Sequence, residues 1–327
     1  MTKEKKLGIL GQIMLLCATL IWGSSFVVLK QTIETVPTYF VLAFRFLLSA
    51  VILFLIFIKK MIKIPKKTLL KGIALGGFLS LAYLTQTIGL IYTTPGKNAF
   101  LTSVYCVLCP FMLWIMFGKK PKIVNVVAGV LCVVGVGFVA LSGKSDNSVS
   151  FLGEGLTLVC AIFYGFQIIF IDKFGKDGCD PVHLLVTELG TVGVFFSVLT
   201  LVFELPTGVS YAIGGDKLVK MLYLCLFCTA IAQLLQMFGQ KFTTSAQASI
   251  ILCLESVFGT VFSVATGEES LTEYLWIGFA VIFIGVLLSE LQPDFNKIRR
   301  AKIKIEKTDK EAEKSEEAKT TENTQNK

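Results

Sequence analysis

The sequence predicts an all-α integral membrane protein with ten transmembrane helices, arranged as two inverted repeats of five helices each. Three observations predict this fold class. Of the 327 residues, 54% are hydrophobic and only 17% are charged, and the mean hydropathy is +0.72, which is typical of membrane proteins. Apolar runs long enough to cross about 30 Å of hydrocarbon recur along the chain. Residues 92–101 resemble residues 242–251, which indicates one membrane module written twice.

The first apolar run, residues 8–29, follows Lys3, Lys5 and Lys6 and therefore also has the charge pattern of a cleaved signal peptide. We predict a transmembrane span, because the run is too long for a signal peptide and no clear small-residue cleavage site follows it. The other spans are predicted at residues 38–58, 70–91, 97–117, 123–142, 153–171, 182–203, 218–239, 245–266 and 271–290.

Each half of the chain carries the same markers in the same order. The aligned pairs include Gly11 with Gly153, Trp22 with Tyr164, Pro37 with Pro181, Gln86 with Gln236, Gly89 with Gly239, Thr94 with Thr244 and Gly129 with Gly278. The halves meet in the loop 142–150, so the predicted organisation is a first repeat at 1–142, a second at 151–291 and a tail at 292–327. Because five is odd, the second repeat is antiparallel to the first, an arrangement typical of secondary transporters.

If the chain has ten spans, most Lys and Arg residues lie in the segments on the same side of the membrane as the N-terminus. That side collects fifteen of them before the tail, and the other side collects five. By the positive-inside rule, we predict a multi-pass protein of the plasma membrane with both termini in the cytoplasm. Most of this signal comes from the first half, so the orientation of spans six to ten depends on the helix count.

The tail, residues 292–327, is predicted to be disordered and cytoplasmic. From Glu306 to Lys327 it is nearly free of apolar residues, and such a segment cannot bury enough surface to fold alone. Its basic beginning, residues 296–304, lies where anionic lipid headgroups would attract it. The net charge of +8 does not indicate nucleic-acid binding, because the Lys and Arg residues lie beside membrane spans rather than on one face of a soluble domain.

Four stretches carry a resemblance to a known family. They are Ile21–Phe26 in span one, Phe44–Phe46 in span two, Thr94–Leu101 running on to Pro110 in span four, and Thr244–Ala246 with Leu254-Glu255 in span nine. Over about residues 8–290 the chain resembles the EamA family of the drug/metabolite transporter superfamily. The resemblance implies ten helices around a central cavity, with export or import of small metabolites by alternating access. The chain departs from the family pattern at Ser256, where Pro usually follows the Glu, and at Lys119, where Glu often follows the Gly.

Charged residues deep in the predicted spans are candidates for substrate binding. Arg45, Glu188 and Glu255 lie within spans two, seven and nine, where a charge costs at least about 2.5 kcal/mol on insertion scales. We expect Arg45 to attract a carboxylate or phosphate, and Glu255 or Glu188 to bind an amine or take up a proton. The alternative for each is a structural ion pair or a snorkelling side chain.

Polar side chains at helical spacing indicate which helix faces line the cavity. In span four, Asn98, Thr102, Tyr105 and Cys109 share one side of a helix, and Gln233, Gln236 and Gln240 do so in span eight. The remaining candidates for substrate binding are Trp22, Ser25, Tyr83, Gln86, Tyr105 and Gln236. An amide in hydrocarbon needs a partner, which is either a ligand or another helix.

Two local distortions are predicted. Gly23, Ser24 and Ser25 are expected to loosen span one and expose its backbone to a substrate, with an interfacial anchor as the alternative role of Trp22. Pro110 frees a carbonyl one turn earlier and should bend span four. We predict that this bend is a gating hinge, with a merely shaping kink as the alternative.

The nine cysteines and the single histidine, His183, do not form a metal-binding pattern. The pairs Cys106 with Cys109 and Cys225 with Cys228 lie inside apolar helices, where cysteine is a packing residue. The sequence also has no nucleotide-binding loop, no zinc-protease helix and no Gly-x-Ser-x-Gly elbow. We therefore predict no metal, no cofactor and no enzymatic activity.

The predicted function is secondary transport of a small metabolite, such as an amino acid or a related organic compound, with proton or ion coupling as an option. Two alternatives are a membrane scaffold or sensor that works through the tail, and an intramembrane enzyme. The substrate, the direction of transport, the coupling ion and the oligomeric state stay open at this point.

Overall fold

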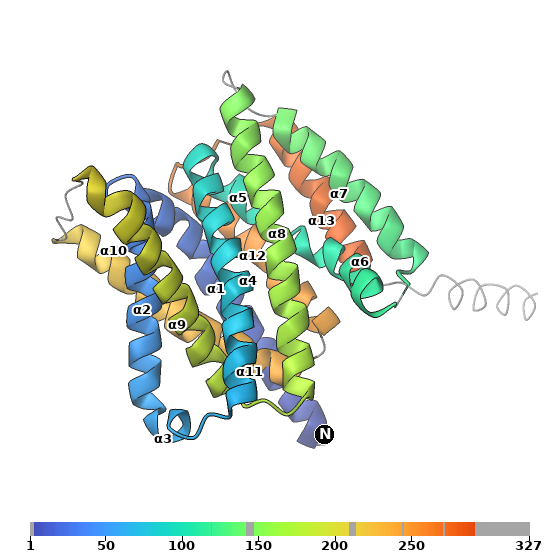
Figure 1. The fold of residues 1–327 in the computed structure, drawn as a ribbon. Helices are drawn as coiled ribbons and strands as arrows, with labels where there is room; N and C mark the ends of the chain where they lie inside the picture. The colour runs from blue at the N-terminus through green and yellow to red at the C-terminus, as the bar shows by residue number, and fades with distance from the viewer. Residues whose placement is uncertain are drawn as a thin grey trace, which may run out of the picture. The chain divides into compact units, whose positions relative to one another are not determined.

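The computed structural model describes residues 3–118, 120–141, 147–208, 214–243, 245–270 and 272–291, and the regular elements in these ranges are helices (Figure 1). They are α1 (Lys3–Ile33), α2 (Thr38–Ile56), α3 (Ile58–Met61), α4 (Lys66–Tyr92), α5 (Pro95–Thr102), α6 (Tyr105–Phe117), α7 (Ile123–Leu141), α8 (Asn147–Lys176), α9 (Pro181–Leu199), α10 (Asp216–Cys225), α11 (Ala232–Lys241), α12 (Ser245–Ala265) and α13 (Glu273–Leu291). The predicted tail, Thr244 and loop residues 142–146 lie outside the described residues.

Within the described residues, seven helical segments are long and apolar enough to cross a membrane. They are Lys6–Ile33, Thr38–Ile56, Lys66–Tyr92, Pro95–Phe117, Phe151–Lys176, Pro181–Thr207 and Asp216–Lys241. Three shorter apolar stretches, Val126–Gly135, Ile251–Ala265 and Glu273–Gly285, lie in α7, α12 and α13. The described chain therefore has the helices of a multi-pass membrane protein.

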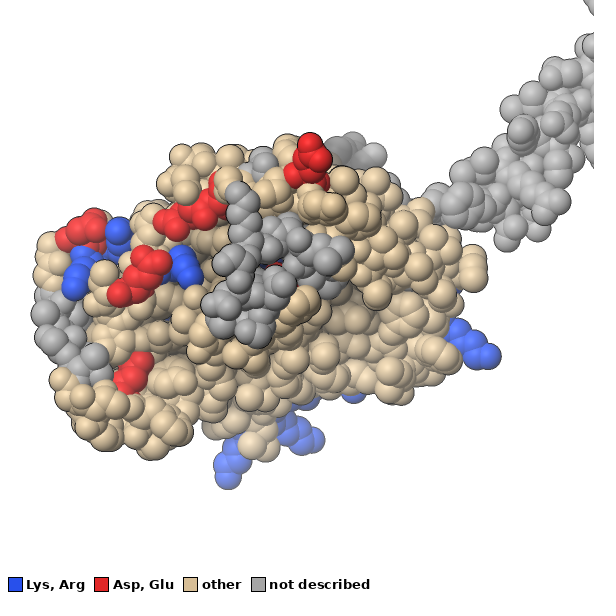
Figure 2. Space-filling model, turned by 90° about the horizontal axis from the view of Figure 1, so that it is seen from above, with Lys and Arg blue, Asp and Glu red and all other residues tan. Residues whose placement is uncertain are grey.

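Ion pairs between helices define two ends of the bundle. At the end that we call the basic end, Lys60 Nζ lies 3.1 Å from Asp180 and Lys71 Nζ lies 2.5 Å from Asp177. At the opposite end, Lys97 Nζ at the start of α5 lies 3.4 Å from Glu154 near the start of α8. Figure 2 looks down on this opposite end, where acidic and basic side chains both appear among the other residues.

Corresponding helices of the two halves run in opposite directions. α1 leaves the basic end and reaches the opposite end, where Lys30 Nζ donates to the carbonyls of Leu90 and Thr93, whereas α8 runs from the opposite end to the basic end (Figure 1). α2 and α9 lie side by side and antiparallel. The end of α9 meets the start of α2 where Glu204, in the π-helical segment η1 (Thr200–Glu204), accepts hydrogen bonds from the backbone N–H groups of Tyr39 and Phe40.

Glycines let helices of different halves approach closely. A Cβ atom at Gly11 in α1 would lie 2.9 Å from the carbonyl oxygen of Gly239 in α11, and one at Gly239 would lie 3.0 Å from that of Gly11. Gly89 in α4 and Gly153 in α8 make the corresponding contact at 2.8 Å in both directions. The sequence alignment pairs Gly11 with Gly153 and Gly89 with Gly239, so this is one contact made twice. Small residues permit such close backbone packing in membranes.

The predicted loosening of α1 is wrong. The helix is continuous from Lys3 to Ile33, because the hydroxyls of Ser24 and Ser25 donate to the carbonyls of Ile21 and Trp22 on their own helix instead of opening it. Gly23 has a packing role, since a Cβ atom there would clash with Phe258 and the backbone of Gly259 in α12.

The predicted span four matches the helical segment Pro95–Phe117, but its break does not lie at Pro110. The segment is divided into α5 and α6 at Ser103 and Val104, whereas Pro110 lies inside α6. The break is a tightened turn in which the N–H groups of Cys106 and Val107 donate to carbonyls only three residues earlier. The direction of the helix therefore changes nearly two turns before the proline.

We expect Gly89→Ala to push α4 away from α8 and to lower the free energy of unfolding by about 1–3 kcal/mol, the range for overpacking. Thermal unfolding in detergent micelles measures this loss. Gly77→Ala on the same helix is the matched control, because no atom lies within 4 Å of a Cβ atom built there. Equal stability of the two variants would contradict the assignment of Gly89 as a crossing point.

Candidate functional site

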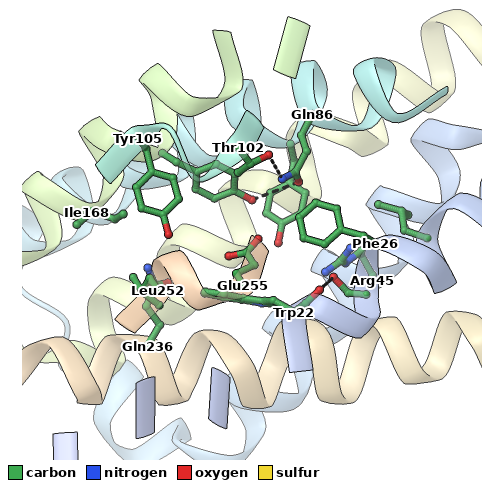
Figure 3. Close-up of a pocket in the computed structure, with 14 residues that line it drawn as sticks. Trp22, Phe26, Arg45, Gln86, Thr102, Tyr105, Ile168, Gln236, Leu252 and Glu255 are labelled. Atoms are coloured by element: carbon green, nitrogen blue, oxygen red, sulfur yellow. Dashed lines mark hydrogen bonds between the residues drawn. The ribbon is translucent and has the colours of Figure 1, made fainter. Parts of the chain in front are cut away.

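A cavity lies in the interior of the described helices, lined mainly by α1, α2, α4, α8, α11 and α12 and by the residues around the α5–α6 break (Figure 3). Eight of the nine predicted substrate-binding residues line it: Trp22, Ser25, Arg45, Tyr83, Gln86, Tyr105, Gln236 and Glu255. Its volume is about 20 Å³, which is room for little more than one water molecule. The helices must therefore separate before a metabolite can enter.

Glu255 on α12 points into the middle of this cavity, beside Trp22 (Figure 3). Only 7% of the residue is exposed. Among the described residues, no side chain forms an ion pair with its carboxylate or donates a hydrogen bond to it. A buried carboxylate without a protein partner is available to a proton or to a cationic ligand.

Arg45 on α2 reaches the same cavity and is held by neutral groups. Its Nε donates to Thr229 Oγ1 at 2.8 Å and its Nη2 to the carbonyl of Cys228 at 3.4 Å. The guanidinium carbon lies 5.1 Å from the ring centres of both Phe46 and Tyr83, close enough for cation–π attraction. Nη1 is buried and has no partner among the described residues, so this cation is not neutralised by a described carboxylate.

A π-helical segment, η3 (Leu226–Ile231), provides the acceptors for these side chains. Its wider turn lets Thr229 Oγ1 donate to the carbonyl of Leu224, five residues earlier. The carbonyl of Cys228 accepts from Trp22 Nε1 at 2.9 Å as well as from Arg45. Such π-helical turns leave carbonyls free for partners on other helices. Sequence reasoning missed Thr229 and Cys228, because no Pro or Gly marks the segment.

The amides of Gln86 and Gln236 line the cavity and also bond to other helices. Gln86 Nε2 donates to Thr102 Oγ1 at 3.1 Å, and its Oε1 lies 3.5 Å from the hydroxyl of Tyr164. Gln236 Nε2 donates to Gln167 Oε1 at 3.3 Å. Each amide therefore both lines the cavity and bonds to another helix, so the geometry agrees with both alternatives, a ligand partner and a helix partner. Gln167, on α8, was missed because it stands in an otherwise ordinary apolar run.

Three tyrosines on different helices form one wall of the cavity. They are Tyr83 on α4, Tyr105 on α6 and Tyr164 on α8. The ring centre of Tyr164 lies 5.8 Å from that of Tyr83 and 6.3 Å from that of Tyr105. Tyr164 was noted in the sequence only as the counterpart of Trp22. Aromatic faces next to a carboxylate suit an organic cation.

Glu188 and two members of the predicted stripe in span four do not line the cavity. Glu188, on α9, is 0% exposed and accepts a hydrogen bond from Gln167 Nε2 at 2.9 Å. Asn98 Nδ2 donates to the carbonyl of Gln86 and to Thr157 Oγ1, and Cys109 packs near Gly165. The break between α5 and α6 changes the helix register, so only Thr102 and Tyr105 of the stripe face the cavity.

Polar contacts close the opposite end of the bundle, beyond the cavity. Glu269, which follows α12, accepts a 2.5 Å hydrogen bond from Thr94 Oγ1, and Lys97 pairs with Glu154. Gln31 Nε2 donates to Glu268 Oε1 at 2.9 Å. Burial raises the pKa of Glu269 above its usual value, against the smaller lowering effects of Thr94 and Lys97. These contacts tie α1, α5 and α8 to the segment after α12.

The described residues contain no group of three or more His, Cys, Asp or Glu side chains that could hold a metal ion. The nine cysteines all lie within the described residues and form no disulfide there, and seven of them are buried. The chemistry of the cavity thus depends on one carboxylate, one guanidinium, two amides and aromatic rings.

The chain is similar to known transporters over nearly the whole of its helical part. The model of the EamA-like transporter family matches residues 9–141 and again residues 151–291, in agreement with the family resemblance found in the sequence. A protein of Archaeoglobus fulgidus named an uncharacterized transporter is 32% identical over 273 residues, which are 84% of this chain and 83% of the relative. The uncharacterized transporter YoaV of Bacillus subtilis is 23% identical over 282 residues, 84% of this chain and 94% of the relative.

Two further similarities concern location and fold. The uncharacterized inner membrane transporter YicL of Salmonella typhimurium is 23% identical over 295 residues, 86% of this chain and 95% of the relative. One crystal structure superposes with a TM-score of 0.64 at 16% identity and covers 86% of this chain and 96% of its own. That likeness shows a shared fold.

We expect Thr229→Val to lower the free energy of unfolding by about 1–3 kcal/mol, because it removes a hydrogen-bond partner of the buried Arg45 guanidinium. Thermal unfolding in micelles tests this. Thr85→Val is the matched control, since the Thr85 hydroxyl bonds only to carbonyls of its own helix. A loss no larger than that of the control would show that Thr229 does not hold Arg45.

We expect Glu269→Gln to raise the midpoint of thermal unfolding at neutral pH and to have no effect at acidic pH. The raised pKa means that the folded protein holds this proton more tightly than the unfolded chain. The wild type therefore loses stability as the pH rises above about 4.5, the usual value for glutamate, and the amide removes this loss while it keeps an acceptor for Thr94.

The control for this titration is Glu273→Gln, which changes an exposed carboxylate at the start of α13. It should follow the wild type at every pH. A Glu269→Gln variant that is less stable than the wild type at neutral pH would contradict the assigned sign.

Proposed function

The chain belongs to the EamA-like transporter family, and from this premise we propose that it is a secondary transporter of a small zwitterionic metabolite, such as an amino acid or a related organic compound. One observation carries the proposal. The cavity presents a carboxyl group, Glu255, and a guanidinium group, Arg45, that form no ion pair with each other. A molecule with both an ammonium and a carboxylate group complements this pair of charges.

The neutral lining of the cavity fits the remaining part of such a substrate. Trp22 and the three tyrosines offer aromatic faces to an ammonium group or to an apolar side chain. Gln86, Gln236 and Ser25 offer hydrogen bonds that fix its orientation. In this proposal, Glu255 binds the ammonium group and Arg45 the carboxylate.

The proposed architecture is ten transmembrane helices in two inverted repeats, residues 1–142 and 151–291, around the cavity. The antiparallel course of corresponding helices and the glycine crossing made twice support it. The lysines at the basic end support an orientation with this end, and both termini, in the cytoplasm of a plasma-membrane protein.

Alternating access would open one end of the bundle at a time. Opening the opposite end must separate Thr94 from Glu269 and Lys97 from Glu154, whereas opening the basic end must separate Lys60 from Asp180 and Lys71 from Asp177. We place the hinge of span four at the break after α5 and assign Pro110 the role of keeping α6 bent next to it.

The test is counterflow of labelled amino acids in liposomes that contain the purified protein. We expect Glu255→Gln and Arg45→Lys to slow transport about tenfold or more, because each weakens a charge-assisted hydrogen bond worth about 1.5–3 kcal/mol. Glu273→Gln, at the start of α13, is the control with the same chemical change outside the cavity, and a variant that ends at Leu291 should transport like the wild type.

Two results would contradict different parts of the proposal. Wild-type rates in correctly folded Glu255→Gln and Arg45→Lys would refute the site. Transport lost on removal of the tail alone, with the helices intact, would favour a function that resides in residues 292–327.

A further inference from the structure

Three polar side chains on three helices form a hydrogen-bonded chain that begins at the cavity and ends at a buried carboxyl group outside it. Gln236 on α11 lines the cavity and donates from Nε2 to Gln167 Oε1 on α8 at 3.3 Å. Gln167 Nε2 in turn donates to Glu188 Oε1 on α9 at 2.9 Å. Glu188 and Gln167 are each 0% exposed and Gln236 is 2% exposed. Glu188 therefore contacts the cavity only through two amides.

Glu188 has no ionic partner among the described residues. Its Oε2 is buried and has no hydrogen-bond partner there, and the described ion pairs do not include it. A carboxylate without an opposite charge is costly to bury in its ionised form, so it gains from a hydrogen-bond donor or from a proton. This carboxyl group is thus suited to bind and release a proton when its surroundings change.

The charged groups on the helices around Glu188 are engaged elsewhere. Arg45 on α2 bonds to Thr229 and to the carbonyl of Cys228. Lys71 on α4 pairs with Asp177, and Lys60 on α3 pairs with Asp180. The other titratable groups on these elements include Lys59 on α3, Lys66, Lys67 and Tyr83 on α4, Glu154, Tyr164, Asp172, Lys173 and Lys176 on α8, His183 on α9, Glu204 in η1, and Lys241 on α11. None of them forms a hydrogen bond or an ion pair with Glu188.

A groove of about 190 Å³ at the basic end leads toward these three side chains. It is lined by Ile171 on α8, Leu184 on α9 and Gln240 on α11. Four residues further into the bundle, one helical turn of about 5.4 Å, the same three helices carry Gln167, Glu188 and Gln236. Residues four apart share a helix face, so the floor of the groove lies next to the polar chain.

The groove also has a polar lining that suits water. The Gln240 residue is only 4% exposed, and both polar atoms of its side chain are buried and have no partner among the described residues. Lys176 and Asp172 line the groove near its mouth. Unsatisfied amide atoms in a groove of this size are typical positions for bound water.

We propose that Glu188 is a proton-binding site filled from the basic end, and that Gln167 relays its protonation state to the cavity at Gln236. The proposal rests on the proposed transport function for its purpose, which is to couple a proton to the substrate. The existence of the proton site itself does not require a substrate.

The relay works by rotation of amide groups. When Glu188 is ionised, it accepts from Gln167 Nε2, Gln167 Oε1 accepts from Gln236 Nε2, and Gln236 keeps Oε1 as its free acceptor. When Glu188 takes up a proton from hydronium in the groove, one O–H bond of the hydronium breaks and leaves water, and the new carboxyl O–H donates to Gln167 Oε1. Gln167 then donates from Nε2 to Gln236 Oε1, and Gln236 offers its N–H₂ group instead. Only one O–H bond forms, and the cavity gains a donor where it had an acceptor.

Such a change makes the affinities for proton and substrate depend on each other, since binding free energies are linked reciprocally. A substrate group that accepts a hydrogen bond from Gln236 would be favoured by the protonated state, which offers a donor. The proton would enter through the groove and thus from the side of the membrane that the basic end faces.

The test is infrared difference spectroscopy of the purified protein between acidic and alkaline pH, with no substrate present. We expect the wild type to show the C=O band of a protonated carboxylic acid that disappears at alkaline pH, together with a change in the glutamine amide bands. Glu188→Gln should lose the amide change and the part of the carboxyl band that Glu188 contributes, while other buried carboxyl groups such as Glu269 keep theirs, and the control Glu273→Gln should keep both signals.

Gln167→Met serves as a second variant, because it removes both amide hydrogen bonds with little change in side-chain length. It should keep the carboxyl band and lose the amide change. An unchanged carboxyl band in Glu188→Gln, or no such band in the wild type, would overturn the proton site. Amide changes that persist in Gln167→Met would overturn the relay.

Transport measurements separate this inference from the proposed function. For any amino acid that the wild type carries, Glu188→Gln should keep counterflow and lose accumulation driven by a proton gradient. If the infrared signals are present and no amino acid is transported, the proton site stands and the proposed function fails.

Discussion

A polar group inside a bilayer finds no water, and this constraint governs the whole arrangement of side chains in the protein. Most buried hydroxyls satisfy it locally, as Thr157 and Ser80 do with carbonyls of their own helices, and Lys30 satisfies it at the exposed carbonyls that end α4. Arg45 and Glu255 are exceptions, because among the described residues neither meets an opposite charge. Glu188 is a further exception outside the cavity, and the cavity differs in bringing an acidic and a basic group of this kind together.

The fold was largely predictable because hydrocarbon leaves a long, uniform signal in the sequence. Apolar runs located the helices, and the aligned glycines are the residues at which helices of different halves cross. The breaks were less predictable. Neither the tightened turn at Ser103 nor the π-helical segment η3 contains a residue that forbids an α-helix, so both result from packing between helices rather than from local preference.

Depth in a span predicted which residues carry charge chemistry, but not which way they face. Arg45 and Glu255 line the cavity, whereas Glu188 lies at a similar depth and faces α8. Thr229, Gln167 and Tyr164 were missed because each is an ordinary residue whose importance depends on a contact with another helix. Such contacts are a property of the assembled bundle, and one sequence does not specify them.

The segment η3 has a consequence for how the two halves have diverged. A π-helical turn holds one more residue than the α-helical ladder needs, and α4, the counterpart in the first half, is an unbroken α-helix. A single inserted residue in one copy is thus sufficient to turn the Cys228 carbonyl toward Trp22 and Arg45. After a duplication, insertions of this size offer an evolutionary route by which two similar repeats come to contribute different chemical groups to one shared cavity. The number of helices does not change.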